Sequence, residues 1–385
     1  MKKSDGGRRH FLRNAAAAMA GMAAFPEISR AATKTYKVKG ISEIRYDKPR
    51  IRFSVIGINH GHINSQVDAV KKGGGEFVSF YAKEPQLAQD FAKKYPGVKQ
   101  VASMNEIFDD NTVQLVVSAA IPDERASIGI EVMKRGKDFM ADKPGIVTMK
   151  QLEDVKRVQK ETRRIYSIMY SERLENGATI KAGELVKEGA IGKVVQTIGL
   201  GPHRMNPKSR PEWFFQPKRY GGIITDIASH QFDQFLFFTG SKKVDVISSQ
   251  VANVSHPEYP ELEDFGDVLL RGDAATGYLR VDWFTPDALN TWGDTRLTVL
   301  GTEGYIEVRK NIDIEGREGA NHLFLVNHKE SKYIDCDDVP LTYGHQLVDD
   351  ILNRTETAMT QEHCFYAAEL AIRAQQAAKR IELKK

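Results

Sequence analysis

The sequence predicts an α/β protein with two domains: an N-terminal doubly wound parallel sheet, and a C-terminal α/β domain with a large, open, mostly antiparallel sheet. Two observations lead to this fold class. Between residues 51 and about 145, short apolar segments alternate with segments of helical periodicity, as in repeated βαβ units. From about residue 193, segments rich in β-branched residues follow one another at hairpin spacing. We therefore expect domains over 51–170 and 171–385.

The first domain opens with an apolar strand over 51–56, and Ile63, Val67 and Val70 share one face of the helix that follows. The continuous apolar run over 113–119 is typical of a strand buried on both faces of a sheet. The other elements expected here are strands over 77–82 and 137–141, and helices over 87–95, 127–135 and 149–164.

The second domain begins with a helix over 176–188, which Gly189 is placed to end. The composition then favours antiparallel strands, because several neighbouring segments are separated only by short turns. Helices over 344–354 and 361–382 end the chain. The expected strands are 193–200, 244–255, 266–271, 276–284, 296–300 and 304–308.

The N-terminus resembles a targeting segment. Arg8 and Arg9 precede Phe11 and Leu12, and a small apolar run follows, which is the order of features in a twin-arginine export signal. We assign 1–32 to a twin-arginine-type signal peptide and 33–50 to a polar leader, and we expect export to the periplasm or the cell envelope. A basic tail and a retained membrane anchor are the alternatives. No segment is long and apolar enough for a permanent membrane span.

Charge and cysteine content narrow the class of protein. Residues 1–32 hold six basic and two acidic side chains, so the rest of the chain carries 49 of each and is formally neutral. A nucleic-acid partner would need a strong basic excess, and we exclude it. We expect Cys336 and Cys364 to be unpaired, and no Cys/His spacing indicates zinc.

The loop from Gly57 to His62, between the first strand and the first helix, is the most informative segment. A strand, a tight glycine turn and a helix are the setting of the Rossmann phosphate loop, whose fingerprint is G-x-G-x-x-G. Asn59 and His62 occupy the positions of its second and third glycines. Histidines such as His60 and His62 can hydrogen-bond a phosphate, but their bulk can also block it, so the loop predicts the fold and leaves the nucleotide open.

Two further motifs carry candidate acid–base groups. Lys143 follows a strand at the ligand-facing edge of the predicted sheet, where partial burial would fit it for proton transfer. Asp226 and His230 are four residues apart after a glycine pair, and on a helix they share a face with Asp233. These groups could act as acid and base across a cleft, or Asp226 and His230 could bind a metal. The structural alternatives are a surface turn and a capped helix with a core histidine.

The segment over 201–215 has the composition of a binding loop. His203, Arg204 and Trp213 could provide an aromatic platform and polar side chains for a sugar, or Trp213 could lie in the core beneath a solvated loop. Three other aromatic residues are expected in the core or at an interface: Trp283, Trp292 and Tyr343.

Taken in order, these motifs resemble those of the glucose–fructose oxidoreductase / inositol dehydrogenase (Gfo/Idh/MocA) family over nearly all of 50–385. The joint order is far more specific than any one motif. The matching positions are the Gly57 loop, Gly136-Lys137 with Asp142-Lys143-Pro144 for the family's G-K…E-K-P, Arg173, Gly189-Ala190-Ile191-Gly192 for G-x-I-G, and Gly221-Gly222 with Asp226, His230 and Asp233 for G-G…D-x-x-x-H-x-x-D.

The resemblance implies a Rossmann domain with tightly bound NAD or NADP, and an open-faced domain that binds a small-molecule carbohydrate and pairs subunits into a homo-oligomer. It implies that Lys143 and His230 handle the proton of the reacting hydroxyl, while Asp226 holds the substrate or orients His230. The implied cofactor-binding residues are Gly57, Asn59, His60, Gly61, His62, Lys83, Pro122 and Lys143. The implied substrate-binding residues are Arg173, His203, Arg204, Trp213 and Asp233, and no metal site is assigned.

Departures from the family pattern keep two hypotheses open. Ala82 stands where an acidic residue usually binds the ribose, Lys83 beside it could tolerate a 2′-phosphate, and Arg125 stands where the family has a histidine. The first hypothesis is an exported NAD(P)-dependent oxidoreductase acting on a sugar, cyclitol or glycoside hydroxyl, including a glycosidase or lyase that oxidises its substrate transiently. The second is a relative that has lost dinucleotide chemistry and binds a carbohydrate or uses a divalent metal.

Overall fold

The structure is a computed structural model that describes residues 34–37 and 46–382. The expected signal peptide, 1–32, lies outside the described residues, as do residues 33 and 38–45 of the expected leader. Among the helices of the described ranges, none is both long and apolar enough to span a membrane. The described residues from Thr35 onward belong to one compact unit, which holds all the sites discussed below.

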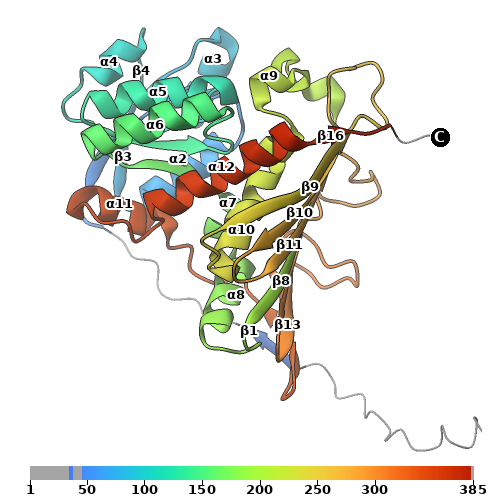
Figure 1. Ribbon diagram of the computed structural model, residues 1–385. Coiled ribbons are helices and arrows are strands. Elements are labelled where there is room, and N and C mark those ends of the chain that lie inside the picture. The colour runs from blue at the N-terminus through green and yellow to red at the C-terminus, as the bar shows by residue number, and fades with distance from the viewer. Residues whose placement is uncertain (1–33, 38–45, 383–385) are drawn as a thin grey trace, which may run out of the picture. The chain divides into compact units, whose positions relative to one another are not determined.

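A parallel sheet forms the first half of this unit (Figure 1), as predicted. Its strand order is β4-β3-β2-β5-β6-β7, so the order reverses between β2 and β5, where open α/β sheets bind their ligands. All residues of β5, β6 and β7 are buried, which fits the apolar runs in β5 and in the middle of β6, although Asp138, Asp142 and Ser167 are buried with them. The strands are β2 (Ile51–Ile56), β3 (Gly75–Tyr81), β4 (Lys99–Gln100), β5 (Leu115–Ser118), β6 (Asp138–Asp142) and β7 (Tyr166–Met169).

Helices from both ends of the chain pack on this sheet. Helix α11 contacts α2, and α12 contacts α6 and β7, although both follow the second domain in the sequence. Helix α5 begins at Pro122, five residues before the expected start, because proline is well suited to the first helical position. The helices here are α2 (Ile63–Lys72), α3 (Pro85–Lys94), α4 (Met104–Phe108), α5 (Pro122–Lys134), α6 (Met149–Thr162), α11 (Tyr343–Asn353) and α12 (Gln361–Ala377).

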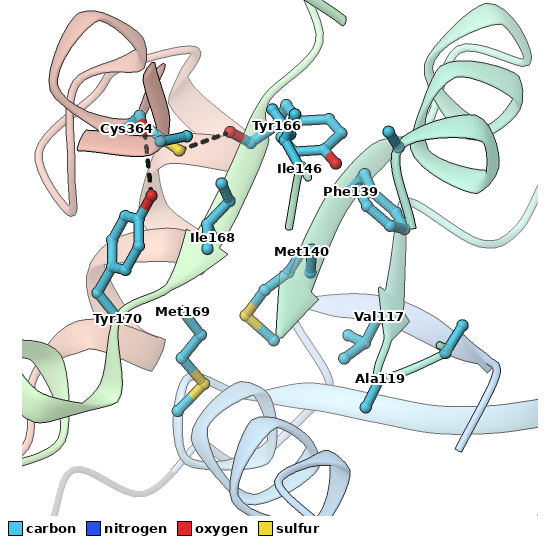
Figure 2. Close-up of a cluster of buried hydrophobic side chains, with 14 of the residues drawn as sticks. Val117, Ala119, Phe139, Met140, Ile146, Tyr166, Ile168, Met169, Tyr170 and Cys364 are labelled. Carbon is cyan, nitrogen blue, oxygen red and sulfur yellow. Dashed lines mark hydrogen bonds between the residues drawn. The ribbon is translucent and has the colours of Figure 1, made fainter. Parts of the chain in front are cut away.

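Figure 2 shows the core where α12 meets the parallel sheet. The Cys364 thiol of α12 donates a hydrogen bond to the Tyr166 carbonyl of β7 at 3.5 Å, and the Tyr170 hydroxyl donates to the Cys364 carbonyl at 3.3 Å. Burial raises the pKa of the Cys364 thiol to about 12. Both cysteines are free, as expected, and both are buried.

The second sheet has the order β1-β15-β14-β13-β12-β8-β11-β10-β9-β16. The β8–β11 and β9–β16 pairs are parallel and the other registered pairs are antiparallel, as the fold class predicts. Its strands are β1 (Lys34–Lys37), β8 (Val194–Pro202), β9 (Val244–Ala252), β10 (Phe265–Gly272), β11 (Thr276–Asp282), β12 (Arg296–Gly301), β13 (Gly304–Arg309), β14 (His322–Asn327), β15 (Ser331–Asp335) and β16 (Lys379–Arg380).

Helices cover one face of this sheet. Helix α8 (Gly177–Lys187) packs on β13 and β14, α10 (Ser229–Thr239) on β8, and α12 on β9. Leu269, Leu300 and Tyr305 alternate with buried residues and are 40–42% exposed, so the opposite face carries large apolar side chains. Two expectations were wrong here: the last helix ends at Ala377 and is followed by β16, and β14 and β15 were not foreseen.

Candidate active site

The loop after β2 is fixed between the neighbouring strands. The Gly57 N–H donates to the Tyr81 carbonyl at 2.9 Å, and the Gly57 carbonyl accepts from the Ala119 N–H at 3.0 Å. Gly57 has φ +79°, and a Cβ there would lie 2.4 Å from the Ala120 Cβ. A Cβ at Gly61, in contrast, would meet no atom within 4 Å, so the loop backbone faces open space there. The loop needs a glycine at 57 and leaves room beside 61.

Asn59, in the position of the second fingerprint glycine, lies between two cavities. It lines a cavity of about 220 Å³ with Gly57, Tyr81 and Lys83, and a larger one of about 400 Å³. Its amide Nδ2 donates to Glu84 Oε1 at 2.8 Å, which fixes the side chain toward the end of β3. Two cavities that meet at the switch point of a parallel sheet fit the two halves of a dinucleotide.

The larger cavity brings together most of the residues predicted from the sequence. It lies at the carboxyl ends of β2, β5 and β6 and reaches the loops that follow β8 and β11. The predicted site residues that line it are Asn59, His60, Gly61, His62, Pro122, Lys143, His203, Trp213 and Asp226.

Lys143 and Asp226 form an ion pair at the wall of this cavity. Lys143 follows the last residue of β6, and Asp226 lies in η3 (Ile224–Ala228), a π-helical turn that leads into α10. Lys143 Nζ is 3.0 Å from Asp226 Oδ1, and the two side chains are 6% and 14% exposed. A largely buried ammonium beside a carboxylate can hydrogen-bond a substrate oxygen and exchange a proton with it.

Two neutral histidines lie near this pair. His203 lines the cavity between Trp283 and Trp292, and its Nδ1 is 3.0 Å from the Gly201 carbonyl. His230 is 2% exposed and does not line the cavity, and its Nδ1 has no hydrogen-bond partner within the described ranges. Burial, and then the charge of Lys143, hold the pKa of both imidazoles well below the usual range.

Asp142 joins the first loop to the end of β6. Its Oδ2 is 3.0 Å from His60 Nδ1 and 3.2 Å from Arg125 Nη2, and its Oδ1 is 3.0 Å from His62 Nδ1. Burial acts to raise the pKa of Asp142, but His62, Arg125 and His60 outweigh it and hold that pKa well below 3.8. Burial and His62 lower the pKa of His60 to about 4, so this ring is neutral at physiological pH.

The structure places three residues of the expected substrate set away from the cavity. Arg173 donates to both carboxylate oxygens of Asp233 at 2.7 and 2.8 Å, and His363 contacts the same carboxylate at 2.8 Å. Asp233 is fully buried in this cluster. Arg204 donates to the carbonyls of Pro286, Leu289 and Thr291 and so holds a loop. In these contacts the three side chains stabilise the scaffold, because their polar groups are already paired.

Several residues of the cavity lining were missed. Trp283 and Tyr343 are buried in the core as expected, but Trp283 also lines the cavity, and so does Trp292, which is 45% exposed. Arg210 also lines it, with its guanidinium 4.5 Å from the Phe214 ring centre and 5.2 Å from that of Trp283. No spacing rule joins these positions, since the Trp283 and Trp292 loops meet the Arg210 loop only in the fold.

Lys83 and Pro122 lie beside the cavities, where residues that bind a cofactor are expected. Lys83 lines the smaller cavity and pairs with Glu124 of α5 at 2.9 Å, with its side chain 54% exposed. Pro122 starts α5 at the larger cavity. Arg125, which stands where the family has a histidine, is buried and donates to the carbonyls of Ala120 and Lys143 at 2.7 and 2.6 Å.

Comparison with known proteins gives consistent results. Residues 51–170 match an oxidoreductase family with an NAD-binding Rossmann fold, and residues 179–307 match the GFO/IDH/MocA C-terminal domain. A solved structure from Erwinia carotovora atroseptica, named provisionally as an oxidoreductase, is 43% identical and has a TM-score of 0.84; the match covers 86% of this chain and 100% of that chain.

Two further proteins are more distant. Levoglucosan dehydrogenase, solved with NADH and levoglucosan, has the same fold at 16% identity, with a TM-score of 0.71 over 85% of this chain and 95% of that chain. The scyllo-inositol 2-dehydrogenase (NADP(+)) of Bacillus subtilis is 24% identical over 46% of this chain and 50% of that protein. The chain matches about half the length of its curated relatives.

Proposed function

Because the chain belongs to the Gfo/Idh/MocA family of oxidoreductases, we propose that it is an NAD(P)-dependent oxidoreductase acting on a hydroxyl group of a sugar, cyclitol or glycoside. The observation that carries the proposal is the Lys143–Asp226 pair, which faces a cavity of about 400 Å³ at the carboxyl edge of the Rossmann sheet. The relatives named for inositol and levoglucosan support a polyhydroxylated substrate.

The two cavities suit a dinucleotide that passes Asn59. The adenosine half would lie beside Tyr81 and Lys83 in the smaller cavity, and the Gly57 turn with open space at Gly61 would accept the pyrophosphate. His60, His62 and Pro122 would lie along the other half, toward Lys143. When bound, the nicotinamide supplies the hydride acceptor or donor. We propose that the cofactor is NAD or NADP and that it stays tightly bound.

Proton transfer falls to the chain's own side chains. Lys143 would hold the proton of the reacting hydroxyl through its ammonium, while Asp226 fixes the direction of that group. His203 lines the cavity and His230 is buried outside its lining, and both rings are neutral because their pKa lies well below the usual range. We assign the transfer to Lys143, and the resemblance to the family implies that His230 shares in handling the proton.

The aromatic lining supports a carbohydrate substrate. Trp213, Trp283 and Trp292 present ring surfaces around one cavity, and Arg210 adds hydrogen-bond donors. Apolar ring faces pack against sugar C–H groups while the hydroxyls require polar partners, and this cavity offers both.

Three finer proposals follow from the sequence. The first is export by the twin-arginine route, which carries folded proteins and would suit an enzyme with a tightly held nucleotide. The second is transient oxidation of a glycoside, which acidifies a neighbouring C–H and permits elimination of the aglycone without net redox change. The third is a homo-oligomer formed through the open face of the second sheet, which carries exposed Leu269, Leu300 and Tyr305.

The nucleotide itself gives the simplest test. The purified chain is denatured, and the supernatant is assayed for NAD, NADH, NADP and NADPH against the protein concentration. We expect close to one equivalent of one of these nucleotides, or a thermal shift on adding it to nucleotide-free protein. If the protein releases none of the four nucleotides and shows no thermal shift with any of them, the proposal is wrong. That result would favour the second hypothesis, a relative that has lost dinucleotide chemistry.

A further inference from the structure

We propose that His60, His62 and Asp142 form a binding site for one divalent transition-metal cation of the Zn²⁺ class at the wall of the larger cavity. These three are the residues of the described ranges whose ligand atoms could surround one ion, because one atom from each lies within 4.8 Å of the others. The proposal does not depend on a bound nucleotide.

The topology brings the three side chains together. The loop after β2 supplies His60 and His62, and the last residue of β6 supplies Asp142; both strands pair with β5. Each histidine Nδ1 is 3.0 Å from a different oxygen of the Asp142 carboxylate. Four ligands around Zn²⁺ at about 2.0–2.1 Å stand roughly 3.3 Å apart, so only small movements would admit the ion.

The His60 ring and the Asp142 carboxylate face each other at the wall of the cavity. His62 contacts both, because its N–H lies 3.4 Å from His60 Nδ1 and its own Nδ1 lies 3.0 Å from Asp142 Oδ1. His60 Nδ1 is 3.0 Å from Asp142 Oδ2, and the Arg125 guanidinium also lies against this oxygen, at 3.2 Å, in an ion pair without hydrogen-bonding geometry. Asp142 is 2% exposed, and a buried carboxylate is stable only where cations or donors surround it. A cation between the nitrogen and the oxygen would satisfy both.

The donor set and its surroundings also fit. Two imidazole nitrogens and one carboxylate oxygen are the protein ligands of many catalytic Zn²⁺ and Fe²⁺ sites, which keep an open position for water or substrate. His60 and His62 line the larger cavity, so the open position would face the space that Lys143 and Asp226 also line.

The charges nearby define the further ligand. Arg125 and Lys143 offset Asp142 and Asp226, so the group is formally neutral before an ion enters. A divalent cation would therefore favour an anionic or oxygen-rich ligand in its open position, such as hydroxide or adjacent hydroxyl groups of a carbohydrate.

Calorimetric titration with ZnCl₂ tests the site. The full chain, without an affinity tag, is stripped with a chelator and freed of nucleotide, and Co²⁺ absorption spectra then report the ligand geometry. We expect one equivalent of Zn²⁺ per chain, and a loss of at least about 100-fold in affinity in His60→Ala and in His62→Ala, since even an outer partner is worth 10–100-fold.

His256→Ala is the matched control, because His256 Nδ1 also lies 2.9 Å from a buried carboxylate, Asp264, without a second histidine. It should bind Zn²⁺ like the wild type. Circular dichroism checks folding, and His60→Gln and His62→Gln replace any alanine variant that does not fold. Absence of stoichiometric Zn²⁺ binding, or unchanged affinity in both loop variants, would refute the site. Nucleotide release is measured separately, so failure of either proposal leaves the other standing.

Discussion

Lys143 is the side chain on which the proposed chemistry depends most. It is 6% exposed, and among the described residues its ion-pair partner is Asp226. We expect Lys143→Ala to lower kcat by roughly 100- to 10,000-fold, the range of general acid–base catalysis, while released nucleotide stays near the wild-type amount. Steady-state kinetics and nucleotide assay measure the two quantities. Lys150→Ala, at a lysine 84% exposed, should match the wild type. Wild-type turnover in Lys143→Ala would remove Lys143 from the mechanism.

Glu175 makes stability depend on pH. Burial raises its pKa from 4.5 to about 7, so between these values the folded state binds more protons than the unfolded state. The free energy of unfolding should therefore fall as pH rises from 4.5 to about 7 and stay reduced above that. At about 1.4 kcal/mol per pKa unit, Glu175→Gln should recover up to about 3 kcal/mol at pH 8 and little at pH 4. Denaturant unfolding at both pH values measures this; an equal effect at both would contradict it.

Individual residues could be placed from the sequence where a motif fixed their neighbours. Lys143 and Asp226 were predicted to meet across a cleft, and the structure brings them to 3.0 Å. Arg173 and Asp233 were expected at the substrate, but their charges are paired in a cluster with His363, which lies 130 residues beyond Asp233. An ion pair between residues this far apart in the sequence forms only through the fold. A local sequence pattern therefore does not predict it.

At the scale of elements, the turn after β2 determines whether the first loop can form. Gly57→Ala would place a Cβ 2.4 Å from that of Ala120 at φ +79°. We expect a loss of about 2–4 kcal/mol in the free energy of unfolding, from the left-handed backbone and the overpacking together. Gly61→Ala is the control, since its Cβ would meet open space. Thermal or denaturant unfolding measures both, and equal stability of the two variants would contradict this account of the loop.

Most strands and helices of the parallel sheet followed from local patterns, but β4, β7 and α4 were not foreseen, and neither were details of the second sheet. Strands β2, β5 and β6 lie at the expected places because their buried apolar residues leave a strong signal. Strand β8 pairs with β11 and β12, both far along the chain, and η3 widens the helix that carries Asp226. The order in which strands pair and the position of a π-helical turn both depend on tertiary contacts. Sequence periodicity alone therefore predicted a sheet and a helix here, without these details.

At the scale of the whole molecule, the open face of the second sheet is the proposed subunit contact. Leu300 and Tyr305 are paired across β12 and β13 and are 41% and 40% exposed. If this face joins copies of the chain, Leu300→Asp with Tyr305→Asp should shift the assembly to monomers, because charges would be buried unpaired. Sedimentation velocity measures the shift. Ile314→Asp, at an apolar residue 60% exposed outside the strands, is the control and should leave the assembly unchanged.

A monomeric wild-type chain, or an assembly that persists in the double variant, would contradict this assignment of the open face. The net charge of the chain gave no information on this face, because residues 33–385 carry equal numbers of basic and acidic side chains. The alternation of exposed and buried residues along β10, β12 and β13 carries the signal instead.

The central claim is that the cavity beside Lys143 and Asp226 oxidises a carbohydrate hydroxyl with a nicotinamide nucleotide. The most direct measurement follows the near-ultraviolet absorbance of reduced nicotinamide when protein loaded with oxidised nucleotide is mixed with sugars, cyclitols and glycosides. We expect at least one substrate to reduce the nucleotide in the wild type, and none to do so at a comparable rate in Lys143→Ala. Two results would contradict the claim. One is reduction of the nucleotide at the wild-type rate in Lys143→Ala, and the other is a loaded wild-type protein whose nucleotide no carbohydrate reduces.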